Sequence, residues 1–122
     1  MKNISFRHWF SAGILLLALQ SSAWAHGFLD HADPKVGGTV TNAPGDVRIW
    51  FTQELEPAFS SIVVNNAQGK EVDKKDSHLD AKNKSLLKVS LPQLSAGTYT
   101  VVWRVVSVDT HPTQGHFEFT IK

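Results

Sequence analysis

Short segments in which hydrophobic and polar residues alternate, separated by turn residues, recur along this 122-residue chain and constrain its fold more than any other feature. In the segment 47–52, the side chains of Val47, Ile49 and Phe51 face one way, which is the period of a strand with one buried face. We expect strands in the segments 26–33, 47–52, 59–65, 85–91, 98–106 and 115–121, and a weak edge strand in the charged stretch 70–84.

No convincing helical period and no internal repeat accompany these segments, so the core must be built from strands. The stretch 98–106 is the strongest strand because it is rich in β-branched and aromatic residues. Trp50 and Trp103 are the largest candidates for the core. Six or seven short strands in fewer than about a hundred residues predict an all-β fold, a single antiparallel sandwich or barrel.

The first 25 residues have the features of a secretory signal peptide. Lys2 and Arg7 give a positive start, the apolar run 12–19 follows, and Ala23-Trp24-Ala25 is an A-x-A cleavage signal. The run is too short to span a bilayer comfortably, and no second apolar run follows it. We therefore expect an exported domain, residues 26–122, with no membrane span after cleavage.

The composition of residues 26–122 excludes several kinds of protein. The 10 basic and 11 acidic residues that remain after loss of Lys2 and Arg7 give a net charge of −1, which does not favour binding to nucleic acid. There is no cysteine, so disulfides, thiolate metal sites and cysteine nucleophiles are absent. The single methionine is Met1, so thioether ligands for Cu(I) are absent from the mature chain.

Three residues form a candidate metal site. Asp109 and His111 are two residues apart and precede Pro112, so on an extended backbone both would project to one face. Cleavage after Ala25 would make His26 the first residue, and its α-amine and imidazole could then chelate one metal ion. Three nitrogens and one oxygen form a ligand set that favours Cu(II) over Cu(I).

Other interpretations of this pattern stay open. A histidine after the cleavage site can be accidental, and an Asp-x-His-Pro segment can be a hydrogen-bonded turn with no metal. The chain would then be a structural sandwich module used for adhesion or assembly. A small copper oxidase or monooxygenase is a further alternative. Hydrolysis is not supported, because the sequence shows no catalytic triad and no carboxylate pair for it. We expect a binding protein rather than an enzyme.

Six segments, in order along the chain, resemble the CopC family of periplasmic copper-binding proteins. They are His26-Gly27-Phe28-Leu29, Asp33-Pro34-Lys35-Val36-Gly37, Val47-Arg48-Ile49-Trp50-Phe51-Thr52, Ala96-Gly97-Thr98-Tyr99, Trp103-Arg104-Val105-Val106-Ser107 and Asp109-Thr110-His111-Pro112. The resemblance covers essentially all of the chain after residue 25, and its last three segments are the most specific.

The resemblance implies a seven-stranded Greek-key β-sandwich with an immunoglobulin-like or cupredoxin-like appearance. It implies one Cu(II) ion per chain, held by His26, Asp109 and His111. It also implies a carrier or buffer in the periplasm that serves copper homeostasis or resistance, often beside a CopD-type inner-membrane copper transport protein. The Met-rich Cu(I) loop of some family members is missing here.

The fourth ligand is left open by the sequence. Some family members carry a glutamate where this chain has Gln53, followed by Glu54. His31 is five residues from His26, hence on the opposite face of a straight strand, and we expect it at the surface or beside a ligand. His116 could orient a ligand but is expected to be exposed, as is His78 in the charged stretch. Water is the remaining candidate.

Overall fold

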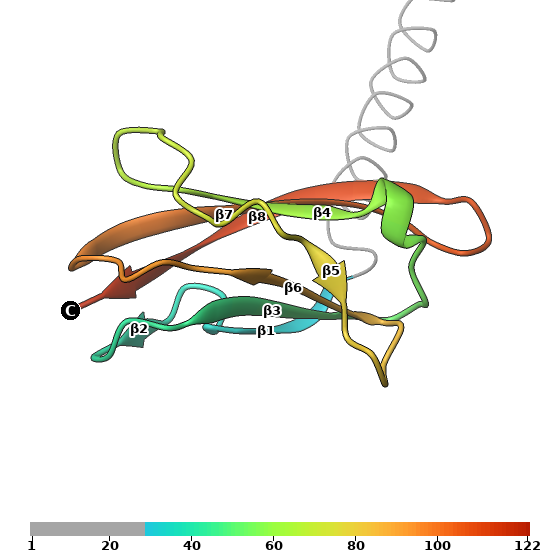
Figure 1. Ribbon diagram of the computed structural model, residues 1–122, viewed down its shortest axis with the longest axis horizontal. Helices are drawn as coiled ribbons and strands as arrows, with labels where there is room; N and C mark the ends of the chain where they lie inside the picture. Colours follow the sequence, from blue (N-terminus) through green and yellow to red (C-terminus); the bar gives the residue numbers. More distant parts are fainter. Residues whose placement is uncertain (1–28) are drawn as a thin grey trace, which may run out of the picture.

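The computed structural model describes residues 29–122, which form two four-stranded sheets packed face to face (Figure 1). The strands are β1 (Leu29–Asp33), β2 (Thr39–Val40), β3 (Asp46–Phe51), β4 (Ser61–Asn65), β5 (His78–Leu79), β6 (Leu86–Ser90), β7 (Gly97–Val106) and β8 (Pro112–Ile121). One sheet has the order β1-β3-β6-β5 and the other β2-β8-β7-β4. All pairs are antiparallel except β2 with β8. The predicted β-sandwich is confirmed.

The strands lie close to their predicted positions, with four differences. β2 forms in a stretch expected to be a loop, which brings the number of strands in residues 29–122 to eight. β5, in the charged stretch, is only two residues long. Phe59 belongs to the short 3-10 helix η1 (Pro57–Phe59), which Pro57 begins and which delays β4 by two residues. β8 begins at Pro112, three residues before its expected start, because the hairpin with β7 pairs up to Val106 and Pro112.

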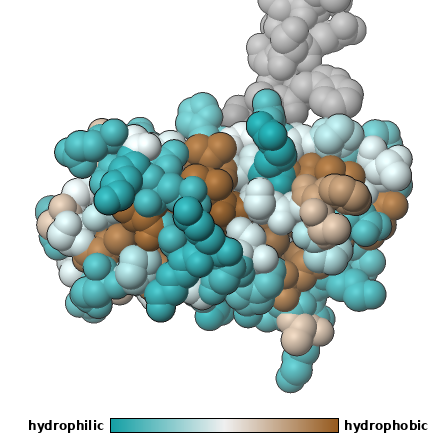
Figure 2. Space-filling view, turned by 45° about the horizontal axis from the view of Figure 1, so that its top comes forward, coloured by the Kyte–Doolittle hydropathy of each residue, from teal (hydrophilic) through white to brown (hydrophobic). Residues whose placement is uncertain are grey.

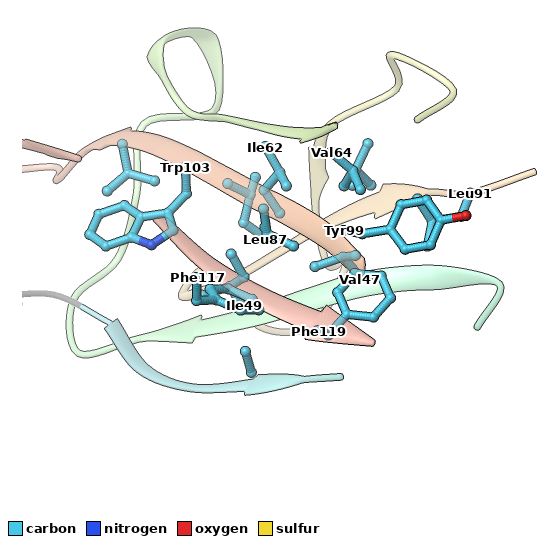
Figure 3. Packing of buried hydrophobic residues seen from close by; sticks show 14 of the residues in the cluster. Val47, Ile49, Ile62, Val64, Leu87, Leu91, Tyr99, Trp103, Phe117 and Phe119 are labelled. Carbon is cyan, nitrogen blue, oxygen red and sulfur yellow. The ribbon is translucent and has the colours of Figure 1, made fainter. Parts of the chain in front are cut away.

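The core lies between the two sheets and consists of the inward-facing residues of every second strand position (Figure 3). Val47 and Ile49 of β3 are completely buried, as their alternation predicts. The ring of Trp103 meets that of Phe51 edge to face, with centroids 5.3 Å apart. The hydroxyl of Tyr99 donates to the Ser95 carbonyl at 2.7 Å, so this buried ring has a partner for its polar atom.

Trp50 was expected in the core, and this prediction is wrong. It lies on the outer face of its sheet and is only partly buried, because residues at even positions of β3 point away from the core. Its indole stacks on the ring of His31, with centroids 4.4 Å apart and planes 9° from parallel. The exposed ring of His31 thus covers part of the Trp50 indole, which lies outside the core.

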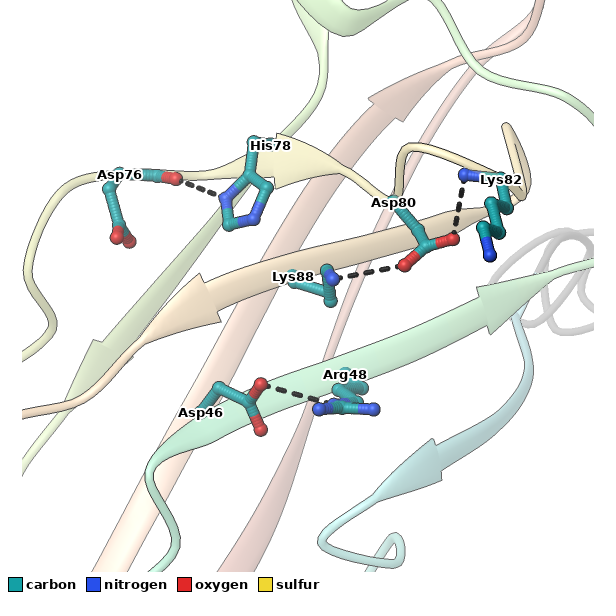
Figure 4. A network of polar contacts seen from close by, with 7 residues as sticks. All are labelled: Asp46, Arg48, Asp76, His78, Asp80, Lys82 and Lys88. Atoms are coloured by element: carbon teal, nitrogen blue, oxygen red, sulfur yellow. Dashed lines mark hydrogen bonds and ion pairs between the residues drawn. The ribbon is translucent and has the colours of Figure 1, made fainter.

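The outer face of the sheet β1-β3-β6-β5 carries charged side chains in pairs (Figure 4). Nε of Arg48 donates to Asp46 at 3.0 Å, and Nζ of Lys88 donates to Asp80 at 3.0 Å. Figure 2 is turned so that the opposite sheet comes forward, and hydrophobic residues gather there in patches among mostly hydrophilic ones. Residues 29–122 contain no helix with the length and apolar character needed to cross a bilayer. The expected signal peptide, 1–25, and His26 lie outside the described residues.

Candidate metal centre

The β7–β8 connection, residues 107–111, is a tight turn closed by its own backbone. The N–H of Ser107 donates to the carbonyl of His111 at 3.1 Å, and the N–H of Thr110 donates to the carbonyl of Ser107 at 2.9 Å. Thr110 has a φ of 70°, in the left-handed region, which turns the chain sharply between its two neighbours. The turn forms the loop at the right-hand end of Figure 1.

This turn brings Asp109 and His111 together. Oδ2 of Asp109 lies 3.3 Å from Nδ1 of His111, and the two side chains are 57% and 63% exposed. The contact does not arise in the predicted way, since the left-handed Thr110 between them excludes an extended backbone. A carboxylate oxygen and an imidazole nitrogen therefore lie side by side and open to solvent. These are the donor atoms of metal sites with nitrogen and oxygen ligands.

The Asp109 carboxyl is held in its ionised form. A hydrogen bond from the hydroxyl of Ser107 is the main reason that the pKa of Asp109 lies below its ordinary value of 3.8. The ring of His111 lowers the pKa of Asp109 further, by hydrogen bonding and by charge, while partial burial opposes both. At neutral pH the carboxylate is thus ready to bind a cation without first losing a proton.

Ser107 is the residue of this turn that sequence reasoning missed. It is fully buried, and its hydroxyl bonds to Oδ1 of Asp109 and accepts the N–H of His111 at 3.1 Å. A signal was available, since serine hydroxyls bond to neighbouring backbone groups in turns and this one precedes Asp109 by only two residues.

The candidates for a fourth ligand lie in different surroundings. The N–H of Val108 donates to the carbonyl of Glu54 at 3.0 Å, so the segment 53–54 runs beside the turn through backbone contact. His31 bonds to Asp30 through Nδ1 at 2.6 Å while it stacks on Trp50. Among residues 29–122, no three His, Asp or Glu side chains are grouped closely enough to hold a metal ion.

His116 instead lines a pocket of about 340 Å³ formed by residues of β1, β7, β8 and the β1–β2 connection. The other lining residues are Leu29, Val36, Trp103, Gln114, Gly115 and Phe117. His116 and His78 are exposed, as predicted from their positions in the sequence.

Comparison with known proteins identifies the fold and its relatives. The family model for the CopC domain matches residues 29–122. Protein YobA of Escherichia coli (strain K12) is 35% identical over 102 residues, covering 83% of this chain and 82% of that protein. Copper resistance protein C of Xanthomonas campestris pv. juglandis is 34% identical over 108 residues, covering 84% of each. The crystal structure of CopC from Methylosinus trichosporium OB3b matches with a TM-score of 0.74 at 35% identity, covering 80% of this chain and 94% of that one. The chain therefore belongs to the CopC family.

Proposed function

We propose that this protein is a periplasmic Cu(II)-binding protein that carries or buffers copper, with one ion held by His26, Asp109 and His111. The observation that carries the proposal is the solvent-open pair in the β7–β8 turn, with Oδ2 of Asp109 3.3 Å from Nδ1 of His111. Its donor atoms are a carboxylate oxygen and an imidazole nitrogen, which suit Cu(II). The relatives named for copper resistance support the choice of metal.

The amino-terminal ligands depend on the proposed removal of residues 1–25 as a signal peptide. Cleavage frees the α-amine of His26, which then offers the metal two nitrogens, from the amine and the ring. Both must be deprotonated to bind, and an α-amine with an ordinary pKa of about 7.7–8.0 loses its proton readily to Cu(II) near neutral pH. The site therefore assembles only after export.

The start of β1 supports a terminus within reach of the turn. Leu29 pairs with Phe51, four residues before Leu55, which bridges to Ser107. Leu29 also lines the same pocket as Gln114, three residues after His111. The three residues from His26 to Leu29 span at most about 10 Å when extended. Such a short segment would keep His26 on the side of Leu29 that we propose lies near the β7–β8 turn.

The ligand chemistry favours a carrier for Cu(II) and not for Cu(I). The chain lacks cysteine, and its only methionine is Met1, so soft sulfur ligands are not available after cleavage. We propose that the protein binds copper and does not catalyse a reaction. It would then pass the ion to a CopD-type inner-membrane copper transport protein.

Competitive titration of the exported protein with Cu(II) tests the proposal. We expect Asp109→Ala and His111→Ala each to weaken binding by more than about 100-fold, which exceeds the usual cost of losing a ligand's hydrogen-bond partner. Asp46→Ala and His78→Ala are the matched controls, since both side chains belong to the other sheet, and both should bind Cu(II) as the unchanged protein does. Unchanged affinity in the Asp109 and His111 variants would contradict the proposal.

A further inference from the structure

The buried hydroxyl of Ser107 touches both residues of the solvent-open pair. It donates to Oδ1 of Asp109 and accepts the N–H of His111 at 3.1 Å, and its own backbone N–H donates to the His111 carbonyl at 3.1 Å. Ser107 has no exposed surface, whereas Asp109 and His111 are more than half exposed. The buried Ser107 thus bonds to both of the exposed residues, Asp109 and His111.

The two oxygens of the Asp109 carboxylate have different surroundings. Oδ1 is bonded to the hydroxyl of Ser107, while Oδ2 lies on the side of His111, 3.3 Å from its Nδ1. A hydrogen bond to one carboxylate oxygen fixes the rotation of the side chain and leaves the other oxygen to bind. The geometry therefore gives the carboxylate one oxygen bonded to the buried hydroxyl of Ser107 and one oxygen that faces the exposed ring of His111.

We propose that Ser107 is a positioning residue for metal binding: its hydroxyl holds Oδ1 of Asp109 so that the carboxylate binds the ion through Oδ2 alone, beside the ring of His111. This inference rests on the proposed function, in which Asp109 and His111 are copper ligands. It adds that Asp109 is a one-oxygen ligand and that Ser107 makes it so.

Ser60 provides a matched comparison for a purely structural role. Its side chain is also buried, and its hydroxyl accepts the N–H of Val106 at 3.2 Å. Val106 is the last residue of β7 and directly precedes Ser107. Among residues 29–122, the N–H of Val106 is the only hydrogen-bond partner of the Ser60 hydroxyl. Removing either hydroxyl takes a buried acceptor from one backbone N–H, but only Ser107 also bonds to the Asp109 carboxylate.

The test compares Ser107→Ala, Ser107→Thr and Ser60→Ala in the exported protein, with Cu(II) affinity and the electron paramagnetic resonance spectrum of the Cu(II) form as readouts. We expect Ser107→Ala to lose about 10- to 100-fold in affinity, the usual cost of losing a ligand's hydrogen-bond partner, and to change the copper hyperfine splitting. Ser107→Thr keeps the hydroxyl and should keep the spectrum, even if its added methyl group lowers the melting temperature. Ser60→Ala should match the unchanged protein in affinity and spectrum.

The same variants separate failure of this inference from failure of the proposed function. If Asp109→Ala weakens Cu(II) binding while Ser107→Ala leaves affinity and spectrum unchanged, the positioning role is wrong and the copper site stands. Equal losses in Ser107→Ala and Ser60→Ala would also overturn it, because a general loss of stability would then explain both. If Asp109→Ala has no effect, the proposed function fails. The metal-free protein still tests positioning, since amide hydrogen exchange at His111 should accelerate in Ser107→Ala but not in Ser60→Ala, and unchanged exchange would refute it.

Discussion

The indole of Trp103 occupies the space that a side chain at Gly115 would need. The two residues are register partners on β7 and β8, and a Cβ atom at Gly115 would overlap Cζ2 of the indole and lie 2.8 Å from its Cε2. Real Cβ atoms are essentially never so close to a neighbour. The largest side chain of the core is therefore accommodated because the facing strand has glycine at this position.

Gly115→Ala should destabilise the protein by about 1–3 kcal/mol, because the added methyl group must displace a buried ring from a packed core. Urea denaturation followed by circular dichroism measures the loss. Gly45→Ala is the control, since nothing lies within 4 Å of a Cβ there, and it should change the free energy of unfolding by less than about 0.5 kcal/mol. Equal effects of the two variants would mean that the indole moves aside at no cost.

The side chain of Asp73 accepts hydrogen bonds from the backbone of β4 and of the segment that follows Asp73. Its Oδ2 accepts the N–H of Val64 at 2.8 Å, and its Oδ1 accepts the N–H of Lys75 at 2.8 Å. Because Val64 is fully buried, Asp73→Ala leaves its N–H without this acceptor and should cost about 1–3 kcal/mol in the free energy of unfolding. Asp46→Ala removes only a surface ion pair with Arg48 and should cost no more than about 1 kcal/mol. An Asp73→Ala variant as stable as Asp46→Ala would contradict this assignment.

Two carboxylates that accept hydrogen bonds from β6 make stability depend on acid pH. A hydrogen bond from Lys88 is the main cause that lowers the pKa of Asp80 below 3.8, and hydrogen bonds from Ser90 do the same for Asp76. A carboxylate whose pKa is lower in the folded state stabilises the fold above its unfolded pKa of about 3.9 and loses this contribution as the pH falls through its folded value. The melting temperature should therefore decrease as the pH is lowered below about 4.

Asp80→Asn removes one of these titrating groups and tests the assignment. We expect the variant to melt lower than the unchanged protein at pH 6, and the gap between them to narrow as the pH falls below about 4. Calorimetry across this pH range measures both curves. A gap that stays constant at every pH would show that ionisation of Asp80 does not contribute to the acid dependence.

The sandwich could be predicted from the sequence because strand alternation is a local property with a period of two. Val47 and Ile49 needed no tertiary information to be placed in the core. The size and hydrophobicity of Trp50 favour the core, but its even position in the same strand directs it to the outer face. Its stacking with His31 depends on the register of β1 against β3. The two-residue strand β2 was missed because its pairing with β8 joins residues 81 positions apart in the sequence.

The pairing of Asp109 with His111 could also be predicted, but the left-handed conformation of Thr110 between them could not. The spacing suggested two side chains on one face of an extended segment, whereas the left-handed Thr110 and the hydroxyl of Ser107 produce the contact. A left-handed threonine is uncommon and leaves no sequence signal. The participation of His26, from the other end of the chain, stays a prediction because residue 26 lies outside the described residues.

The most direct measurement is a competitive Cu(II) titration of residues 26–122, the proposed mature protein, against the same chain with one alanine added before His26. The added residue turns the α-amine of His26 into an amide and leaves Asp109, His111 and the sandwich unchanged. The account predicts that the extended protein binds Cu(II) at least about 100-fold more weakly and that its electron paramagnetic resonance spectrum loses a nitrogen ligand. Equal affinity and identical spectra for the two proteins would contradict a copper site built on the mature amino terminus.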